Sequence, residues 1–516
     1  MAHSSFFIVY SEEKMKRSTY IVCCLLIGWM SLLLGCEGLE EHYSTNPAYR
    51  LSFSMDTLAF DTVFSSVGST TRQFMVYNPN NEPLEMEQVM LASGEASGFR
   101  MNLDGRKGSR FDRVGIAAHD SMYVFVEVTV NPNGQNQPLL IQDSVLFDVN
   151  GIRQSVLLEA YGQDVHLCKG GVTLAQDTLF AADRPYLIYD SLVVAEGATL
   201  TLGEGVTFYM HDQANLIVYG TLRAEGTPSN PVTLRGDRLD YILNDVLPYD
   251  RTPGQWGGIC FRASSYQNEL AYTIVRNGTN GILCEPSTPD QPKLRLRHAQ
   301  VTNMANDLLV AVNSDVEATD TEFSNAGGSV ATLVGGTYYF AHCTLANYMS
   351  LTARRSISDE NTLDSKCLYL LHEATVNGQG PYPIQQAYFD NCLIDGSFGA
   401  GDLLTGGEIQ LSAGDYDYRF NHCVLKAKPS DDSRFNEVLF VSESPLYRAT
   451  GGQANKYAYD FRLDTVAAPG VGQADVAISR LYPLDWYGVN RLESANGPTI
   501  GAYEFVPKEA EEAKQP

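Results

Sequence analysis

"HAQVTN" (298–303), "DTEFSN" (320–325) and "HCTLAN" (342–347) recur at intervals of 22 residues. Val301, Phe323 and Leu345 occupy the same position in the three segments. A period near 22 residues, with short apolar runs and no helical pattern, is the length of one coil of a parallel β-helix. Equivalent residues of successive coils would then lie about 4.8 Å apart, which is one strand spacing. The repeat therefore predicts a solenoid.

The same register explains the neighbouring His and Cys of the third segment. Ala299, Thr321 and Cys343 fall in one column, and adjacent residues of a strand point to opposite faces. We therefore expect Cys343 inside the coil, as a small buried residue, with His342 pointing outward. This separation argues against a shared metal ion and against a Cys–His catalytic pair, so the two residues are interpreted as packing.

Each of the three segments ends in an asparagine. At a recurring turn this residue tolerates left-handed backbone angles, and its side chain can hydrogen-bond along the stack. The predicted structural ladder consists of Asn303, Asn325 and Asn347.

Residues 49–165 have a different pattern, in which short alternating runs are separated by turn residues. "RQFMVYNPNNEPLEMEQVML" (72–91) contains two such runs around an Asn-Pro-Asn-Asn turn. Roughly five to eight strands at this spacing predict an antiparallel β-sandwich. The arrangement resembles the Ig-like modules of bacterial surface and periplasmic proteins, which usually serve as spacers or docking units.

Three stretches resemble the opening coils of right-handed parallel β-helix proteins of Bacteroidota: "GATLTLGEGVTFYM" (197–210), "LIVYGTLRAEGTPSNPVTLRG" (216–236) and "GQWGGI" (254–259). "NGPTIGAYEF" (496–505) resembles the closing strand of such solenoids. The resemblance implies a pectate-lyase-like β-helix over 170–505. The polar stretch "KEAEEAKQP" (508–516) predicts a disordered tail, taken as 506–516. It implies no activity, because the same scaffold carries lyases, hydrolases and adhesins. The expected fold class is all-β, an Ig-like antiparallel sandwich followed by a right-handed parallel β-helix.

The N-terminal residues look like a targeting segment. "KMKR" (14–17) is a basic region, and the apolar run "TYIVCCLLIGWMSLLLG" (19–35) follows it. "LLGC" (33–36) resembles the cleavage box of bacterial lipoproteins, which would make 1–36 a signal peptide with Cys36 as the lipidated residue and 37–48 a tether. An ordinary membrane anchor is the alternative, although the run is short for a spanning helix. The resemblance implies a lipid-anchored protein of the outer membrane or cell surface.

The remaining cysteines give no sign of a metal site. Of the ten cysteines, Cys23 and Cys24 lie in the apolar run and Cys36 follows it, which leaves seven. Their number is odd and they form no CxxC pair, so neither a zinc site nor a full disulfide framework is expected. Cys343, Cys392 and Cys423 would stack if their coils are neighbours. We expect no metal and no cofactor.

An insert at 236–251, "GDRLDYILNDVLPYDR", interrupts the coil rhythm. Inserts in solenoids often carry function, because they need not fold into the core. The candidate ligand-binding residues are Asp237, Asp240, Tyr241, Asp245, Tyr249, Asp250 and Arg251. A charged loop that only covers the coil is the simpler interpretation of the same residues.

Composition and motifs narrow the function. The net charge of −25 argues against nucleic-acid binding, because such a chain repels phosphates. The paired acids of pectinase-like hydrolases have no counterpart here, so no catalytic residue is assigned. The leading hypothesis is a non-catalytic surface lipoprotein that binds a polysaccharide or a surface protein through inserts on the β-helix. The alternative is a polysaccharide lyase or glycoside hydrolase that uses the acids at 237–250.

Overall fold

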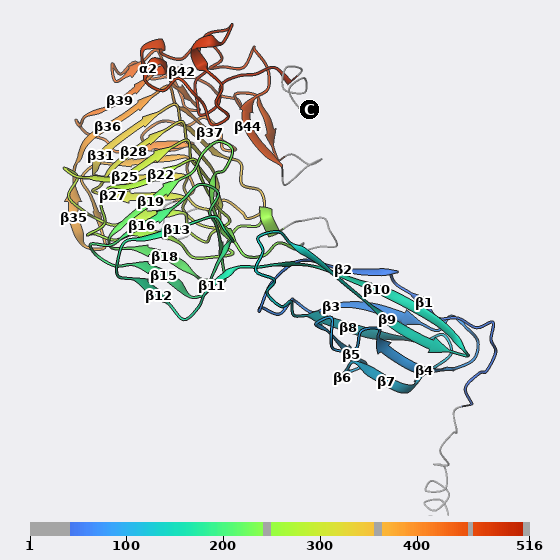
Figure 1. Ribbon diagram of the computed structural model, residues 1–516. Coiled ribbons are helices and arrows are strands. Elements are labelled where there is room, and N and C mark those ends of the chain that lie inside the picture. Colours follow the sequence, from blue (N-terminus) through green and yellow to red (C-terminus); the bar gives the residue numbers. More distant parts are fainter. Residues whose placement is uncertain (1–41, 241–248, 356–363, 452–457, 509–516) are drawn as a thin grey trace, which may run out of the picture. The chain divides into compact units, whose positions relative to one another are not determined.

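The computed structural model describes residues 42–240, 249–355, 364–451 and 458–508. Cys36 and the other residues of the predicted signal peptide therefore lie outside the described residues. The chain divides into two compact units. The first comprises residues up to Leu58 together with Thr70–Glu127 and Gln142–Leu158, and the second comprises the rest. Figure 1 shows antiparallel strands in the N-terminal part and stacked parallel strands after them.

Two antiparallel sheets of five strands form the N-terminal part of the described chain. The first has the order β1 (Ser52–Phe53), β3 (Arg72–Tyr77), β8 (Ser121–Val128), β5 (Phe99–Leu103) and β6 (Arg106–Gly108). The second has the order β2 (Thr57–Phe64), β10 (Ile152–Gln163), β9 (Leu139–Val149), β4 (Leu84–Leu91) and β7 (Arg110–Ile116).

The two sheets pack face to face through alternate side chains. Phe74 of β3 meets Phe147 of β9 edge-on, with ring centres 6.2 Å apart, and Phe53 of β1 lies 5.0 Å from the same ring. In β8 buried residues alternate with more exposed ones, as the period of two requires. The predicted antiparallel sandwich is confirmed.

Three long parallel sheets build the second part, and successive coils add one strand to each sheet until the last coils, which add none to the nine-stranded sheet (Figure 1). Sheet I has the order β11 (His166–Cys168), β14 (Tyr186–Ile188), β17 (Thr207–Met210), β20 (Val232–Gly236), β23 (Thr273–Arg276), β26 (Gln300–Met304), β29 (Glu322–Ala326), β32 (Thr344–Asn347), β37 (Leu393–Gly396), β40 (Val424–Leu425) and β42 (Leu439–Phe440).

Sheets II and III make the other two faces. Sheet II has the order β12 (Val172–Leu174), β15 (Ser191–Val194), β18 (Asn215–Val218), β21 (Gly258–Phe261), β24 (Ile282–Cys284), β27 (Leu309–Val312), β30 (Ala331–Val334), β33 (Leu368–Leu371) and β38 (Ile409–Leu411). Sheet III has the order β13 (Thr178–Phe180), β16 (Thr199–Leu202), β19 (Thr221–Glu225), β22 (Asn268–Ala271), β25 (Pro292–Arg297), β28 (Asp315–Thr319), β31 (Gly336–Ala341), β36 (Ile384–Asp390), β39 (Tyr418–Asn421) and β41 (Phe435–Asn436). The predicted parallel β-helix is confirmed.

The repeat of 22 residues is the register of sheet I. Val301 pairs with Phe323, and Phe323 pairs with Leu345 in the next coil. All three side chains are fully buried in the core of the coils. Stacking of like residues at one strand spacing produces a continuous apolar column, which is why an exact lap length appears in the sequence.

A left-handed residue lies one or two positions before each strand of sheet I over six coils. These residues are Tyr272, His298, Asp320, His342, Asn391 and His422, with φ between 42° and 54°. The turn aims the next side chain into the coil, so Cys343, Cys392 and Cys423 are all buried inside it. The Cys392 amide lies 3.4 Å from the Cys423 sulfur, and no cysteine of the described residues forms a disulfide.

His342 points away from the coil interior but is not exposed to solvent, which corrects the simple outward placement. A short helix, α2 (Val476–Leu481), covers it. His342 Nε2 lies 3.0 Å from Ser479 Oγ and accepts a hydrogen bond from Asn391 Nδ2 at 2.9 Å. Burial holds the pKa of His342 well below its usual value, so the ring is neutral.

The parallel strands end at Phe440, and the expected closing strand at 496–505 belongs to none of the parallel sheets. Residues 473–505, here called the C-terminal strap, instead lie along the outside of sheet I. The strap meets the left-handed column in reverse order: Gln473 O binds His422, Asp475 N binds Asn391, and Leu484 O binds His298. Later in the strap, Gly501 N donates to Asn391 O at 2.8 Å.

The other elements after the coils, or outside them, are short. They are the hairpin β34 (Ala374–Val376) and β35 (Gln379–Tyr382), the hairpin β43 (Tyr447–Thr450) and β44 (Tyr459–Leu463), and the 3-10 turns η1 (Tyr249–Arg251) and η2 (Arg491–Glu493). Buried Arg491 ties the strap to the coils, because its Nη2 lies 2.9 Å from Asp320 Oδ1. Within the strap, its Nη1 lies 3.9 Å from Glu504.

Candidate functional site

The insert at 236–251 does not collect its described acids into one open site. Asp237 Oδ2 lies 2.6 Å from His211 Nδ1 of the neighbouring coil. Asp240 receives two hydrogen bonds from Arg238, at 2.7 and 2.5 Å, and the same guanidinium lies 4.0 Å from the ring centre of Tyr249. Burial raises the pKa of Asp237, while the hydrogen bond with His211 opposes that shift. Asp240 thus has a cationic partner in Arg238, and Asp237 is hydrogen-bonded to a histidine.

The rest of the insert splits into two groups. Tyr241, Asp245 and the side chain of Asp250 lie outside the described residues. Arg251 stands apart from its sequence neighbours, because it lines a groove on the outer face of sheet I. Its backbone oxygen accepts a hydrogen bond from Asn303 Nδ2 at 2.8 Å, which fixes the end of the insert to the coils.

This groove is the candidate functional site, with a volume of about 480 Å³. Strands β23, β26 and β29 form its floor, and the β43–β44 hairpin and the strap form its walls. The lining residues are Arg251, Arg276, Asn277, Gln300, Thr302, Asn303, Glu322, Ser324, Asn325, Ala458, Tyr459, Asp460, Phe461, Arg462, Tyr487 and Tyr503.

Two outward columns of sheet I make the floor polar. Gln300 pairs with Glu322 in one column, and Thr302 pairs with Ser324 in the other. The next coil continues the second column with Ala346, which belongs to an apolar cluster with residues of the hairpin and the strap. The polar floor of the groove therefore borders the apolar cluster through which the hairpin and the strap pack against sheet I.

Asn303 and Asn325, predicted as structural residues, also line the groove. Their φ angles of 60° and 62° are left-handed, as a turn asparagine allows. Asn303 Nδ2 donates to Asn277 Oδ1 at 2.8 Å, a bond along the stack, while its own Oδ1 is buried and accepts no hydrogen bond from any described residue. Asn347 lies in the next coil, outside the groove, and accepts from and donates to the backbone of Ala326.

Aromatic side chains form the walls. Tyr487 is 55% exposed, and its ring lies 5.8 Å from that of Tyr503 and 5.2 Å from the Arg462 guanidinium. Tyr459 and Phe461 stack at 6.2 Å with an interplanar angle of 15°. Contacts with neighbouring groups hold these rings in place, so they present fixed planar surfaces.

The two carboxyl groups of the groove have different environments. Glu322 accepts hydrogen bonds from the Tyr503 hydroxyl and, at 2.5 Å, from Ser324 Oγ. Burial raises the pKa of Glu322 above the usual value of a glutamate. Burial acts in the same direction at Asp460, but hydrogen bonds from the side chain and the backbone amide of Arg462 outweigh it and lower the pKa of Asp460. The pKa values of the two carboxyl groups therefore shift in opposite directions.

Most residues of this groove were not predicted from the sequence. Gln300, Glu322, Thr302 and Ser324 sit at outward positions of the same repeat that revealed the core, so their polar character was a readable signal. Tyr487 and Tyr503 gave no sequence signal of a site, because nothing in the repeat indicates where a distant segment packs against the coils. Within 42–240, 249–355, 364–451 and 458–508, no cluster of His, Cys, Asp and Glu could hold a metal ion. No helix in those ranges is both long and apolar enough to span a bilayer.

Comparisons with known proteins leave the chain without a family, since no family model matches it. A stretch of 86 residues, 17% of the chain, is 33% identical to the protein bark beetle of Drosophila melanogaster, and the match covers 3% of that protein. Two solved structures resemble parts of the fold. A family 123 glycoside hydrolase from Clostridium perfringens has a TM-score of 0.16 at 6% identity, over 22% of this chain and 26% of the other. The E. coli chaperone DraB has a TM-score of 0.17 at 10% identity, over 22% and 55%. At these TM-scores neither structure carries an argument about function.

Proposed function

We propose that this protein is a surface lipoprotein that binds an oligosaccharide, without cleaving it, in the groove on sheet I. The observation that carries the proposal is the meeting of a polar floor with aromatic walls. Sugar hydroxyls need donors and acceptors together, and amide and hydroxyl side chains offer both. The apolar face of a sugar ring needs a flat aromatic partner, and Tyr487 offers an exposed one.

A glycan suits the groove better than a protein partner does. Protein interfaces centre on a desolvated apolar patch, whereas this floor consists of Gln300, Thr302, Glu322 and Ser324 with asparagines beside them. The unpaired Oδ1 of Asn303 is a buried acceptor, which a ligand hydroxyl would satisfy. The volume of about 480 Å³ falls in the range of small-ligand sites.

The proposal is tested with the mature chain on a glycan array, followed by incubation of each bound glycan and an assay for released reducing ends. Binding without release supports the proposal. A chain that binds no glycan, with the fold intact by circular dichroism, contradicts it. The Tyr249→Ala variant, which alters an insert tyrosine outside the groove, serves as the matched control for Tyr487→Ala.

Glycoside hydrolysis is the second candidate, favoured by one observation. The opposite pKa shifts of Glu322 and Asp460 match the acid and base roles of a hydrolase. Release of reducing ends that disappears in both Glu322→Gln and Asp460→Asn would establish this alternative. Release that persists in either variant would remove it. The alternative in which acids of the 237–250 insert catalyse cleavage gains no support, because Asp237 and Asp240 are paired outside the groove.

The lipid anchor of the proposal rests on the sequence. Cys36 follows the apolar run as the first residue of a mature lipoprotein would, and attachment there would tie the chain to a membrane. The test is metabolic labelling with a palmitate analogue in a bacterial host. Label should be lost in Cys36→Ser and retained in Cys24→Ser, which changes a cysteine inside the apolar run. Equal labelling of both variants would contradict the anchor.

A further inference from the structure

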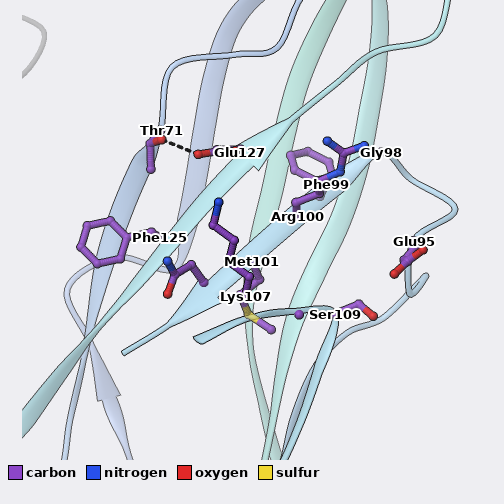
Figure 2. A pocket seen from close by; sticks show the side chains of 12 residues that line it. Thr71, Glu95, Gly98, Phe99, Arg100, Met101, Lys107, Ser109, Phe125 and Glu127 are labelled. Carbon is purple, nitrogen blue, oxygen red and sulfur yellow. Dashed lines mark hydrogen bonds between the residues drawn. The ribbon is translucent and has the colours of Figure 1, made fainter. Parts of the chain in front are cut away.

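A second hollow lies within the first unit, independent of the groove. Its volume is about 680 Å³, and all its lining residues fall between Thr71 and Glu127. Strands β5, β6 and β8 of the first sandwich sheet build it, together with the loop that carries Glu95. Figure 2 shows the side chains around it, with Lys107 extending between Phe125 and Arg100 in that view.

The residues on its floor share the outer face of the sheet. In β8 the outward residue Phe125 follows buried Val124, and its ring stacks on Tyr123 with centres 5.8 Å apart. Asn102 of β5 pairs directly with Lys107 of β6, which places both side chains on one face. Thr71 Oγ1 donates to Glu127 Oε1 at 2.7 Å at the rim (Figure 2). The hollow thus combines a supported aromatic ring with polar groups around it.

Two cations beside the hollow lack partners. Arg100 and Lys107 are exposed, and neither forms an ion pair with a described residue. Two other arginines of the same unit do form ion pairs, Arg110 with Asp112 and Arg113 with Glu85. The two cations line one hollow in a chain with a net charge of −25, in which acids that could neutralise them are abundant. Their arrangement fits an anionic group supplied from outside.

Asn102 adds an unsatisfied acceptor at the same place. Its Oδ1 is buried and accepts no hydrogen bond from any described residue. A buried acceptor without a donor destabilises the folded state, so such atoms call for a partner. A ligand hydroxyl would provide the missing donor, while the carboxylates of Glu95 and Glu127 can accept further hydroxyls.

We propose that this hollow is a second binding site, specific for an acidic saccharide. The carboxylate of a uronic acid binds Arg100 and Lys107, the ring face lies on Phe125, and a hydroxyl donates to Asn102 Oδ1. The site is separate from the sheet I groove and does not depend on it. No bond is made or broken in this site.

The test is calorimetric titration of the full mature chain with trigalacturonate and with its methyl ester. The Tyr487→Ala background is used throughout, so that the groove does not contribute and the failure of one site is distinguished from failure of the other. We expect the acid to bind at least tenfold more tightly than the ester, and more weakly as salt increases. The double variant Arg100→Gln/Lys107→Gln should weaken binding of the acid at least tenfold.

The matched control is Arg110→Gln/Arg113→Gln, which removes two exposed cations of the same unit that already have partners. It should leave the affinity unchanged. A Phe125→Ala variant with an unaltered melting temperature should also bind more weakly. Equal affinity for acid and ester overturns the proposal, as does equal loss in the control, or absence of binding to trigalacturonate at millimolar concentration.

Discussion

The 236–251 insert and the groove on sheet I contain the same kinds of residue, namely acids, arginines and tyrosines. They differ in where the partners come from. In the insert, Arg238 binds Asp240, two positions along the chain. In the groove, the hydroxyl of Tyr503 binds Glu322, which lies 181 positions earlier. The groove also contains one short-range pair, Arg462 with Asp460. The long-range contacts of the strap, however, bring the exposed face of Tyr487 to a floor where Asn303 Oδ1 accepts no hydrogen bond from any described residue.

The largest effect is expected from Arg491, which holds the strap beside the groove, in comparison with Arg238 of the insert. Arg491→Ala leaves Asp320 and Glu504 as buried carboxyl groups without their cation, so we expect a loss of about 3–5 kcal/mol in the free energy of unfolding. Glycan binding should fall with it, because Arg491 holds the strap that carries Tyr487. Urea unfolding and calorimetric titration measure the two effects.

Arg238→Ala is the counterpart in the insert. Its partner is only partly buried and its own side chain is 39% exposed, so the loss should stay below about 1 kcal/mol with glycan affinity unchanged. If Arg238→Ala and Arg491→Ala lowered stability and glycan affinity equally, the distinction between the locally paired insert and the groove held by the strap would be contradicted.

The pH dependence of stability should reveal the buried Asp320, which is the partner of Arg491. Burial raises the pKa of Asp320 to about 7, whereas an unfolded aspartate titrates near about 4. Between those values the folded protein binds more protons at this site than the unfolded chain, so this contribution to stability decreases as pH rises from about 4 to about 7. As pH rises over that interval, the free energy of unfolding of the wild type should therefore fall relative to that of Asp320→Asn. Urea unfolding at pH 4.5, 5.5 and 7 measures this difference. A difference that stays constant, or changes in the other direction, would refute this.

The smallest effect is expected in the insert. Asp240→Asn removes one partner of a half-exposed pair outside the groove, so stability should change by less than about 1 kcal/mol. Glycan affinity and any release of reducing ends should equal those of the wild type. A clear loss of either in titration or assay would restore the insert as the functional region.

The sequence allowed the coils to be predicted because their physics is local and periodic. Val301, Phe323 and Leu345 repeat at the lap length and alternate along each strand, so position in sequence determined position in the core. Cys343, Cys392 and Cys423 followed the same rule.

The groove could not be predicted in the same way. It exists only because the strap folds back along sheet I, and the contacts that place it join residues far apart, such as Arg491 and Asp320, 171 positions apart. The burial of His342 has the same origin, since α2 covers a residue that the strand pattern alone points into solvent. Besides Arg251 and the turn asparagines Asn303 and Asn325, the local signal of the groove consisted of the polar residues at outward positions 300, 302, 322 and 324.

The most direct test of the account is the affinity of the mature chain for its tightest array glycan, measured by titration for wild type, Tyr487→Ala and Tyr249→Ala. Loss of the exposed ring of the groove should weaken binding about tenfold or more, equivalent to about 1.4 kcal/mol, with no change in melting temperature. Tyr249→Ala should bind as the wild type does. Unchanged affinity in Tyr487→Ala, or a loss confined to Tyr249→Ala, would contradict glycan binding in the groove.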